Sequence, residues 1–121
     1  MEAHPRDATY SVKLNKYTIE SITHAAFLSG YQVGLVEGTY HKIFTQHMDF
    51  TESNVLRAVI ETARETGSNF VGVWTDEKMN VHIDPCEYIH HRVNAVQMAE
   101  KNNQLSIWDW ENMEEIVKAD W

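Results

Sequence analysis

One amphipathic segment, residues 51–66, constrains the fold more than any other part of the sequence. Thr51 is a good N-cap residue, Glu52 stands in the first turn, and Gly67 is placed to end a helix. The apolar residues between them repeat at the spacing of one helix face: Val55, Leu56, Val59, Ile60 and Ala63. The pattern predicts an amphipathic helix that buries one face.

Alternating residues predict strands on both sides of this helix. Thr9–Leu14 and Tyr31–Val36 precede it, the second followed by a tight turn at Glu37–Thr39 and a hairpin partner at Tyr40–Gln46. Phe70–Trp74 follows the helix. Another strand, Val81–Asp84, is expected to extend the sheet antiparallel to it.

Residues 18–29 carry Ile19, Ile22 and Ala26 at helical spacing, and Gly30 stands where a left-handed cap belongs. A helix here gives the element order strand, helix, strand, strand, helix, strand. The sequence therefore predicts an α+β fold of ferredoxin-like (split βαβ) order, with an antiparallel sheet and two helices on one face.

A strand-helix-strand extension is expected at the C-terminal end. Asp84-Pro85 with Glu87 has the pattern of a capping box, which predicts a helix centred on Val93, Val96 and Ala99. Asn102-Asn103 is expected to break that helix. The strand Gln104–Trp108 and a short helical segment, Glu111–Ala119, are predicted to follow.

Composition favours one small domain spanning residues 1–121. The 121 residues, 43% of them hydrophobic, allow roughly two thirds of the chain's surface to be buried. The single cysteine, Cys86, has no disulfide partner within the chain. Residues 1–7 do not resemble a signal peptide, and no apolar run approaches the roughly 18 residues of a spanning helix. We therefore expect a cytoplasmic protein without a membrane partner.

The charge is strongly negative. Eighteen Asp and Glu against 10 Lys and Arg give a formal net charge of -8, which disfavours binding to a nucleic-acid polymer. Two interpretations of this acidity remain open. Either the acidic surface keeps the protein soluble, or it presents a face that resembles nucleic acid to a basic protein partner.

The predicted hairpin of Phe70–Trp74 and Val81–Asp84 has one mixed face. Pairing valine with valine sets Val73 against Val81, Trp74 against Asn80 and Phe70 against Asp84. His82 shares that face, and Gly72 is expected to leave a dip between the two rings. Such a surface suits a planar base, which stacks on an aromatic ring and is hydrogen-bonded at its edges.

A structural explanation competes with this one, because the exposed face of such a sheet often forms a dimer interface that would bury Phe70 and Trp74. A pocket at the dimer seam would satisfy both interpretations. Trp108 and Trp110 are expected to be packing residues of the C-terminal strand.

His82, Cys86 and His90 form the only candidate metal cluster in the sequence. Cys86 and His90 would share a helix face, with His82 within reach, but the second ligand pair of a structural zinc site is missing. A nucleophilic Cys86 lacks an orienting acid and an oxyanion donor. Because glycine-rich phosphate loops and hydrolase motifs are also missing, we expect neither metal, cofactor nor enzymatic activity.

Several segments carry a family resemblance: Phe70-Val71-Gly72-Val73-Trp74-Thr75-Asp76, Val81-His82-Ile83-Asp84, Asn94-Ala95-Val96-Gln97-Met98-Ala99 and Asn103-Gln104-Leu105-Ser106-Ile107-Trp108-Asp109. They resemble small phage proteins that end in an Ala-rich helix followed by Asn-Gln-x-x-Ile-Trp-Asp. Among these, the chain looks most like the first-described Thoeris anti-defence family, the cyclic-ADP-ribose-isomer sponges. The similarity covers about the C-terminal half.

The resemblance implies a non-enzymatic homodimer or larger homo-oligomer that sequesters a cyclic ADP-ribose signal in the infected bacterial cell. Some members also bind cyclic oligonucleotides at separate sites. A phenylalanine and an asparagine of this hairpin would carry the ligand, which correspond to Phe70 and Asn80. We expect Trp74, His82 and Arg92 to line the pocket. The chain departs from this expectation in its charge. A pyrophosphate ligand needs positively charged hydrogen-bond donors, and near the hairpin the sequence offers only Lys78, Arg92 and Arg57.

Two alternatives remain open. The chain is either the sponge or an acidic inhibitor that blocks a nucleic-acid-binding host or defence protein through its surface. A metal-dependent hydrolase using the His82, Cys86 and His90 cluster is a third and weaker possibility.

Overall fold

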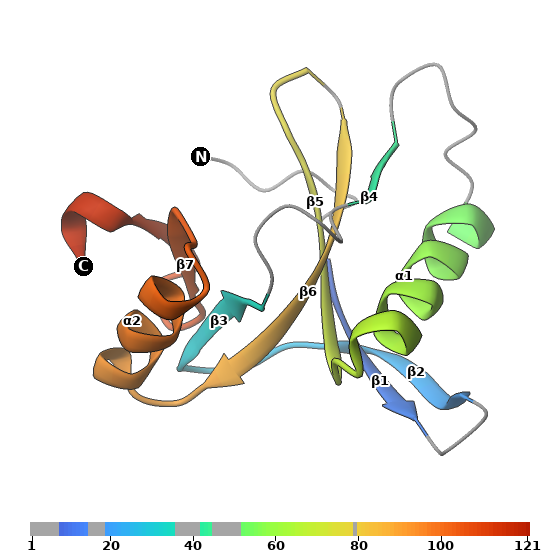
Figure 1. The fold of residues 1–121 in the computed structure, drawn as a ribbon, viewed down its shortest axis with the longest axis horizontal. Helices are drawn as coiled ribbons and strands as arrows, with labels where there is room; N and C mark the ends of the chain where they lie inside the picture. Colours follow the sequence, from blue (N-terminus) through green and yellow to red (C-terminus); the bar gives the residue numbers. More distant parts are fainter. Residues whose placement is uncertain (1–7, 15–18, 36–41, 45–51, 79) are drawn as a thin grey trace.

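Every strand pairing in the described chain is antiparallel (Figure 1). The computed structural model describes residues 8–14, 19–35, 42–44, 52–78 and 80–121, which form an α+β fold. The elements are β1 (Ala8–Leu14), β2 (Ile19–Ala25), β3 (Tyr31–Gly34), β4 (Lys42–Phe44), α1 (Glu52–Thr66), β5 (Phe70–Thr75), β6 (Val81–Ile89), α2 (Arg92–Lys101), β7 (Ser106–Asp109), β8 (Glu114–Val117) and the 3-10 turn η1 (Lys118–Asp120).

The sheet has the order β2-β1-β5-β6-β3-β7-β8, and β4 pairs with β6 outside this path. Helix α1 lies against β1, β5 and β6, whereas α2 lies near β3 and β7 at the other end of the sheet (Figure 1). Neither of these helices has the length and apolar character needed to cross a membrane. The two helices therefore cover different parts of one sheet.

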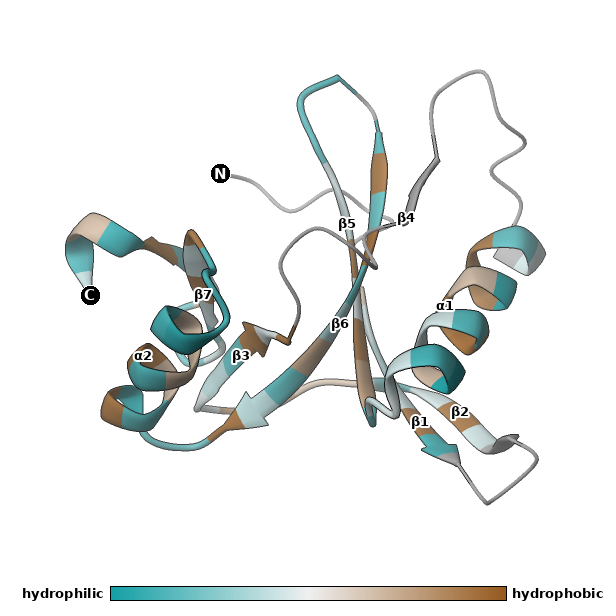
Figure 2. Cartoon of the chain, in the orientation of Figure 1, coloured by the Kyte–Doolittle hydropathy of each residue, from teal (hydrophilic) through white to brown (hydrophobic). Residues whose placement is uncertain are grey.

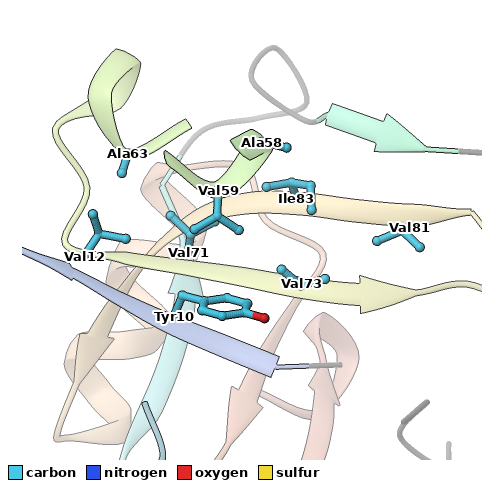
Figure 3. Close-up of a cluster of buried hydrophobic side chains, with 9 residues drawn as sticks. All are labelled: Tyr10, Val12, Ala58, Val59, Ala63, Val71, Val73, Val81 and Ile83. Carbon is cyan, nitrogen blue, oxygen red and sulfur yellow. The ribbon is translucent and has the colours of Figure 1, made fainter. Parts of the chain in front are cut away.

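The amphipathic helix predicted from residues 51–66 is confirmed as α1. Val59 and Ala63 are fully buried against a sheet surface that includes Val71 and Ile83 (Figure 3). Gly67 ends the helix with φ +71°, a conformation that glycine adopts without strain. The predicted cap Thr51 lies outside the described residues. This cluster is the larger of the two cores.

A second, smaller core forms where α2 covers β3, β7 and β8. Its fully or nearly fully buried members are Val33, Ala95, Ala99, Ile107 and Ile116. Asn102-Asn103 ends α2 as predicted, because Asn103 adopts φ +53° and the amide of Gln104 donates to the carbonyl of Ala99. The predicted C-terminal strand is present as β7, two residues later at its start than expected.

The helix predicted for residues 18–29 is wrong, because Ile19–Ala25 forms the edge strand β2. An edge strand pairs with one neighbouring strand and needs few apolar residues. A few apolar residues at helical spacing are therefore compatible with a strand at the edge of the sheet. Ile22 pairs with Val12 of β1 and packs on the larger core. Its β-branched side chain also favours a strand. Gly30 has φ +90° but caps no helix.

The predicted pairing of Tyr31–Val36 with Tyr40–Gln46 is also wrong where it can be compared. β3 pairs with β6 and β7, while β4 pairs with residues Val81, His82 and Ile83 of β6. The turn predicted at Glu37–Thr39 lies outside the described residues. Non-local pairing with the long strand β6 takes the place of the local hairpin.

The capping box predicted at Asp84-Pro85 does not start a helix. β6 continues through Pro85 to Ile89, and the register of β3 sets Tyr31 against Ile89 and Val33 against Glu87. These residues find backbone partners in β3, so α2 begins only at Arg92, and its N-cap residue, His91, makes no side-chain hydrogen bond that caps the helix. Tertiary pairing overrides the local helix signal.

The helical segment predicted for Glu111–Ala119 is wrong over most of its length, because Glu114–Val117 forms the strand β8 and only Lys118–Asp120 is helical, as the 3-10 turn η1. The Asp109 carboxylate accepts hydrogen bonds from the backbone amides of Glu111 and Asn112, and Met113 adopts φ +52°. This turn reverses the chain, so that β8 pairs with β7. With strands at β2 and β8, the described elements do not follow the predicted ferredoxin-like order.

The larger core gives a direct stability test. Replacing Ile83, which is fully buried, by Ala removes apolar contacts and leaves a cavity, so Ile83→Ala should lower the free energy of unfolding by about 2–5 kcal/mol. The control Leu105→Ala alters a side chain that is 80% exposed and should change it by less than about 0.5 kcal/mol. Urea unfolding of both variants measures the difference. Equal losses would contradict the assigned core.

Candidate functional site

The β5–β6 hairpin has a register shifted by two residues from the predicted one. Trp74 pairs with His82, Gly72 with Asp84, and Phe70 with Cys86. Because side chains alternate with period two, this shift preserves the face on which each one lies. Trp74, His82 and Asp84 therefore share one face, whereas Val73 and Ile83 lie on the other, toward α1.

The side chain of Asp76 explains the shift. Its Oδ1 accepts hydrogen bonds from the backbone amides of Lys78 and Asn80, at 2.8 and 2.9 Å. The amide of Asp76 also donates to the carbonyl of Asn80. The turn therefore begins at Asp76 and ends at Asn80, so Asn80 belongs to the turn and not to β6. An Asp side chain often stabilises a turn by accepting hydrogen bonds from backbone amides a few residues later in the chain. A register predicted only from the pairing of valines does not take this interaction into account.

Trp74 is the most exposed aromatic feature of this hairpin. Its ring is parallel to that of His82, with centroids 3.9 Å apart and an interplanar angle of 6°. Its indole Nε1–H donates to Asp84 Oδ2 at 2.6 Å. The side chain nevertheless remains 39% exposed. Stacking and hydrogen bonding thus hold a large aromatic ring in one orientation at the surface.

His82 links this ring to the turn. Its Nε2 lies 2.8 Å from Asp76 Oδ2, while His82 itself is largely buried. The hydrogen bond from His82, with further ones from Asn80 and Lys78, lowers the pKa of Asp76 from 3.8 to about 2. Asp76 is consequently ionised at neutral pH. We call Trp74, Asp76, Asn80, His82 and Asp84 the Trp74 surface.

The dip expected at Gly72 is filled from within the chain. A Cβ at this position would lie 2.8 Å from Nε2 of Gln32, which reaches across from β3. Gln32 accepts a hydrogen bond from Thr9 Oγ1 at 2.8 Å and donates to Cys86 Sγ at 3.0 Å. Gly72 therefore makes room for a polar cross-strand bridge and does not leave a slot for a base.

Phe70 lies at the other end of β5, four residues from Trp74, which corresponds to about 13 Å along a strand. It makes an edge contact with Phe27, whose ring stacks on Tyr88 with centroids 3.8 Å apart. Trp110 also contacts Phe27 and is buried, as expected of a packing residue. The sequence missed Phe27 because its segment was assigned to a helix.

Arg92 is also separated from the Trp74 surface. It begins α2, beyond the far end of β6, and the strand from His82 to Ile89 alone spans roughly 23 Å. Its Nη2 donates to the carbonyl of Asp120 at 2.9 Å. Of the five predicted ligand residues, the structure brings together Trp74, Asn80 and His82, and it does not bring Phe70 or Arg92 to them.

The candidate metal cluster is spread along a strand. Cys86 lies within β6 and His90 directly follows its last residue, Ile89, so extended chain and not a helical turn joins Cys86 to His90. His82 and Cys86 lie about 13 Å apart along the same strand. Within the described ranges, no group of three His, Cys, Asp or Glu side chains is arranged to hold a metal ion. Burial raises the pKa of the Cys86 thiol to about 12, which opposes a nucleophilic role.

Comparison of the chain with protein-family models, with curated proteins and with solved structures gives no match. The site must therefore be interpreted from its own chemistry. The Trp74 surface offers a fixed aromatic ring, two carboxylates and an imidazole beside the hydrophilic turn between β5 and β6 (Figure 2).

The low pKa of Asp76 predicts how this surface responds to acid. A carboxylate with a lowered folded-state pKa stabilises the fold above its ordinary pKa, and that stabilisation is lost as the pH falls toward about 2. Asp76→Asn should therefore be less stable than the wild type above pH 4, and the difference should shrink as the pH approaches 2. Urea unfolding across this range measures it.

Glu77→Gln serves as the matched control, since it removes an equal charge from an exposed residue of the same turn. It should not reproduce the pH-dependent difference. If the Asp76→Asn deficit were independent of pH, the carboxylate would not have the low pKa assigned to it.

Proposed function

We propose that this protein is a non-enzymatic binding protein that captures a small planar molecule on the Trp74 surface. The observation that carries the proposal is the Trp74 ring, which is held by His82 and Asp84 while 39% exposed. Fixing an aromatic ring before the ligand arrives reduces the entropy lost on binding. Stacking on such a ring contributes about 1–3 kcal/mol per base.

The particular ligand class proposed is a cyclic nucleotide immune signal, a cyclic ADP-ribose isomer, held without cleavage. This assignment rests on the resemblance to phage anti-defence sponges, and it would place the protein in the cytoplasm of an infected bacterial cell. Trp74 would stack the base on the ring face that His82 does not cover, and Asn80 would contact the edge of the base.

Phe70 and Arg92 enter the proposal only through assembly. Both lie far from Trp74 within one chain, so they would contribute to the same pocket only if a second copy supplied them. A homodimer or larger homo-oligomer, which the resemblance implies, is therefore part of this proposal. Native mass spectrometry would report the number of subunits together with any nucleotide that remains bound.

The sponge proposal predicts depletion of ligand without turnover. The protein is mixed with cyclic ADP-ribose isomers, the ligand left in the filtrate is measured, and the protein is then denatured by heat. We expect intact ligand to be released on denaturation. Trp74→Ala should weaken binding about 5- to 150-fold, the equivalent of one lost stacking contact.

Val117→Ala is a suitable control for this experiment, because it shortens an apolar side chain of comparable exposure, 47%, on β8. Its affinity should match that of the wild type. Appearance of a linear product would identify an enzyme instead, and no depletion of any isomer would sink the sponge proposal.

A second candidate is favoured by the carboxylates around the ring. Residues 74–84 contain three carboxylates, Asp76, Glu77 and Asp84, against the single cation of Lys78. An arginine side chain stacks on an indole and pairs with carboxylates, so the same surface would suit a basic protein. In this case the chain would act as an acidic inhibitor of a nucleic-acid-binding host or defence protein.

The inhibitor proposal predicts binding that is strongly sensitive to salt. A hexa-arginine peptide should bind the wild type at low ionic strength and dissociate as salt is raised, since screening weakens exposed charge pairs. Asp84→Asn should weaken the complex, and Phe70→Ala should leave it unchanged. Isothermal titration across a salt series measures these effects. Binding that ignores both salt and Asp84→Asn would exclude this candidate.

A further inference from the structure

The two strands at the ends of the sheet differ in charge. β2 and β8 are the outermost strands of the order, so each pairs with a described strand on one side only. β8 carries two exposed carboxylates, Glu114 and Glu115. The residues of β2 from Ser21 to Ala25 include no acidic side chain, lysine, arginine or proline. Charged residues and proline protect edge strands against pairing with another chain, so this part of β2 lacks that protection.

The pairing of β1 shows which backbone groups of β2 point outward. The amide of Val12 donates to the carbonyl of Asn69, on the side of β1 that faces β5. Because the backbone groups of an antiparallel strand alternate in direction, those of Ser11 point to the other side, toward β2. Ser11 pairs with Thr23, whose N–H and C=O therefore point back to β1. The backbone groups of the residues on either side of Thr23 point away from the sheet.

Ile22 and His24, the neighbours of Thr23, make this edge complementary to itself. Each has one outward N–H and one outward C=O. When two copies meet antiparallel around a two-fold axis at Thr23, Ile22 of each copy lies opposite His24 of the other, and all of these groups find partners. Thr23 then lies opposite Thr23 of the second copy, a cross-strand pair that stabilises sheets.

The larger core reaches this edge. Ile22 packs against that core, and the ring of His24 packs on Tyr10, with centroids 4.7 Å apart. Both side chains lie on the face of the sheet that α1 covers, since their partners Val12 and Tyr10 are core residues. Pairing of two β2 edges would set Ile22 beside His24 of the second copy and continue this packing across the contact.

We infer that residues 21–25 of β2 form a dimerisation edge, through which two copies of the chain join antiparallel into one continuous sheet. A second copy is the occupant because this edge pairs with itself without opposing like charges, although the chain carries a net charge of -8. Two β8 edges would instead oppose their carboxylates. The described sheet has one such uncharged edge, so the contact closes at a dimer and does not propagate into a filament.

The inferred contact does not involve the Trp74 surface, because β1 lies between β2 and β5 (Figure 1). In the dimer, β1 and β2 of both copies separate the two β5 strands. Phe70 of one copy therefore does not reach Trp74 of the other through this contact. The inference goes beyond the proposed function and does not depend on a ligand.

The test measures the oligomeric state of the intact chain by sedimentation velocity over a concentration series. We expect a dimer for the wild type. Thr23→Lys places two positive charges directly opposite each other and should raise the dimer dissociation constant about 10-fold or more. Thr23→Val keeps a neutral β-branched side chain and should leave the dimer intact. Asn94→Lys makes an equal charge change on the exposed surface of α2 and should also leave the dimer intact.

Cysteine cross-linking tests the register. Opposed residues of a non-hydrogen-bonded antiparallel pair lie within the distance that a disulfide spans, so Thr23→Cys should form disulfide-linked dimers on mild oxidation. Leu28→Cys, at a side chain that is 96% exposed outside β2, is the control and should form few. The native Cys86 is buried, so the wild type should form none.

A wild type that stays monomeric throughout the series would overturn the inference. A dimer that survives Thr23→Lys, or that Thr23→Cys does not link, would place the interface elsewhere and overturn it equally. Capture of cyclic ADP-ribose isomers by a monomer would leave ligand capture standing without the β2 contact. The failures of the two proposals are therefore distinguishable.

Discussion

The long strand β6 is the constraint on which the rest of the structure depends. The first residues of β6 pair with β5 and with β4, and its last residues pair with β3. Val81 and Ile83 contribute to the core under α1, and the last residues carry the chain toward α2. Because one strand connects both helix-covered regions, its pairing partners decide the positions of the other strands.

The alternation of side chains along β6 also separates stability from the candidate function. Ile83 points into the apolar core, while His82 and Asp84 point to the opposite face, where they support Trp74. Substitutions on the second face therefore leave the apolar contacts of the larger core in place. The turn formed by Asp76 completes this surface, since it fixes the register that sets His82 opposite Trp74.

Charge shapes the possible ligands of this surface more than aromaticity does. An exposed tryptophan accepts many planar partners, whereas two neighbouring carboxylates discriminate against anions and favour hydrogen-bond donors or cations. An arginine of a basic partner satisfies both conditions. The overall charge of -8 acts in the same direction, so affinity for any anionic ligand must arise from short-range contacts.

The sequence alone determined α1, β1, β5 and the face shared by Trp74, His82 and Asp84. These features depend on local periodicity, which is visible within the residues of a single helix or strand. It did not determine β2, the continuation of β6 or β8, since each of these segments has apolar residues or caps compatible with a helix. Only tertiary structure decided them, by supplying backbone hydrogen-bond partners from strands distant in the chain. For the same reason, only the folded chain showed that Gln32 fills the space at Gly72 and that Phe70 and Arg92 lie apart from Trp74.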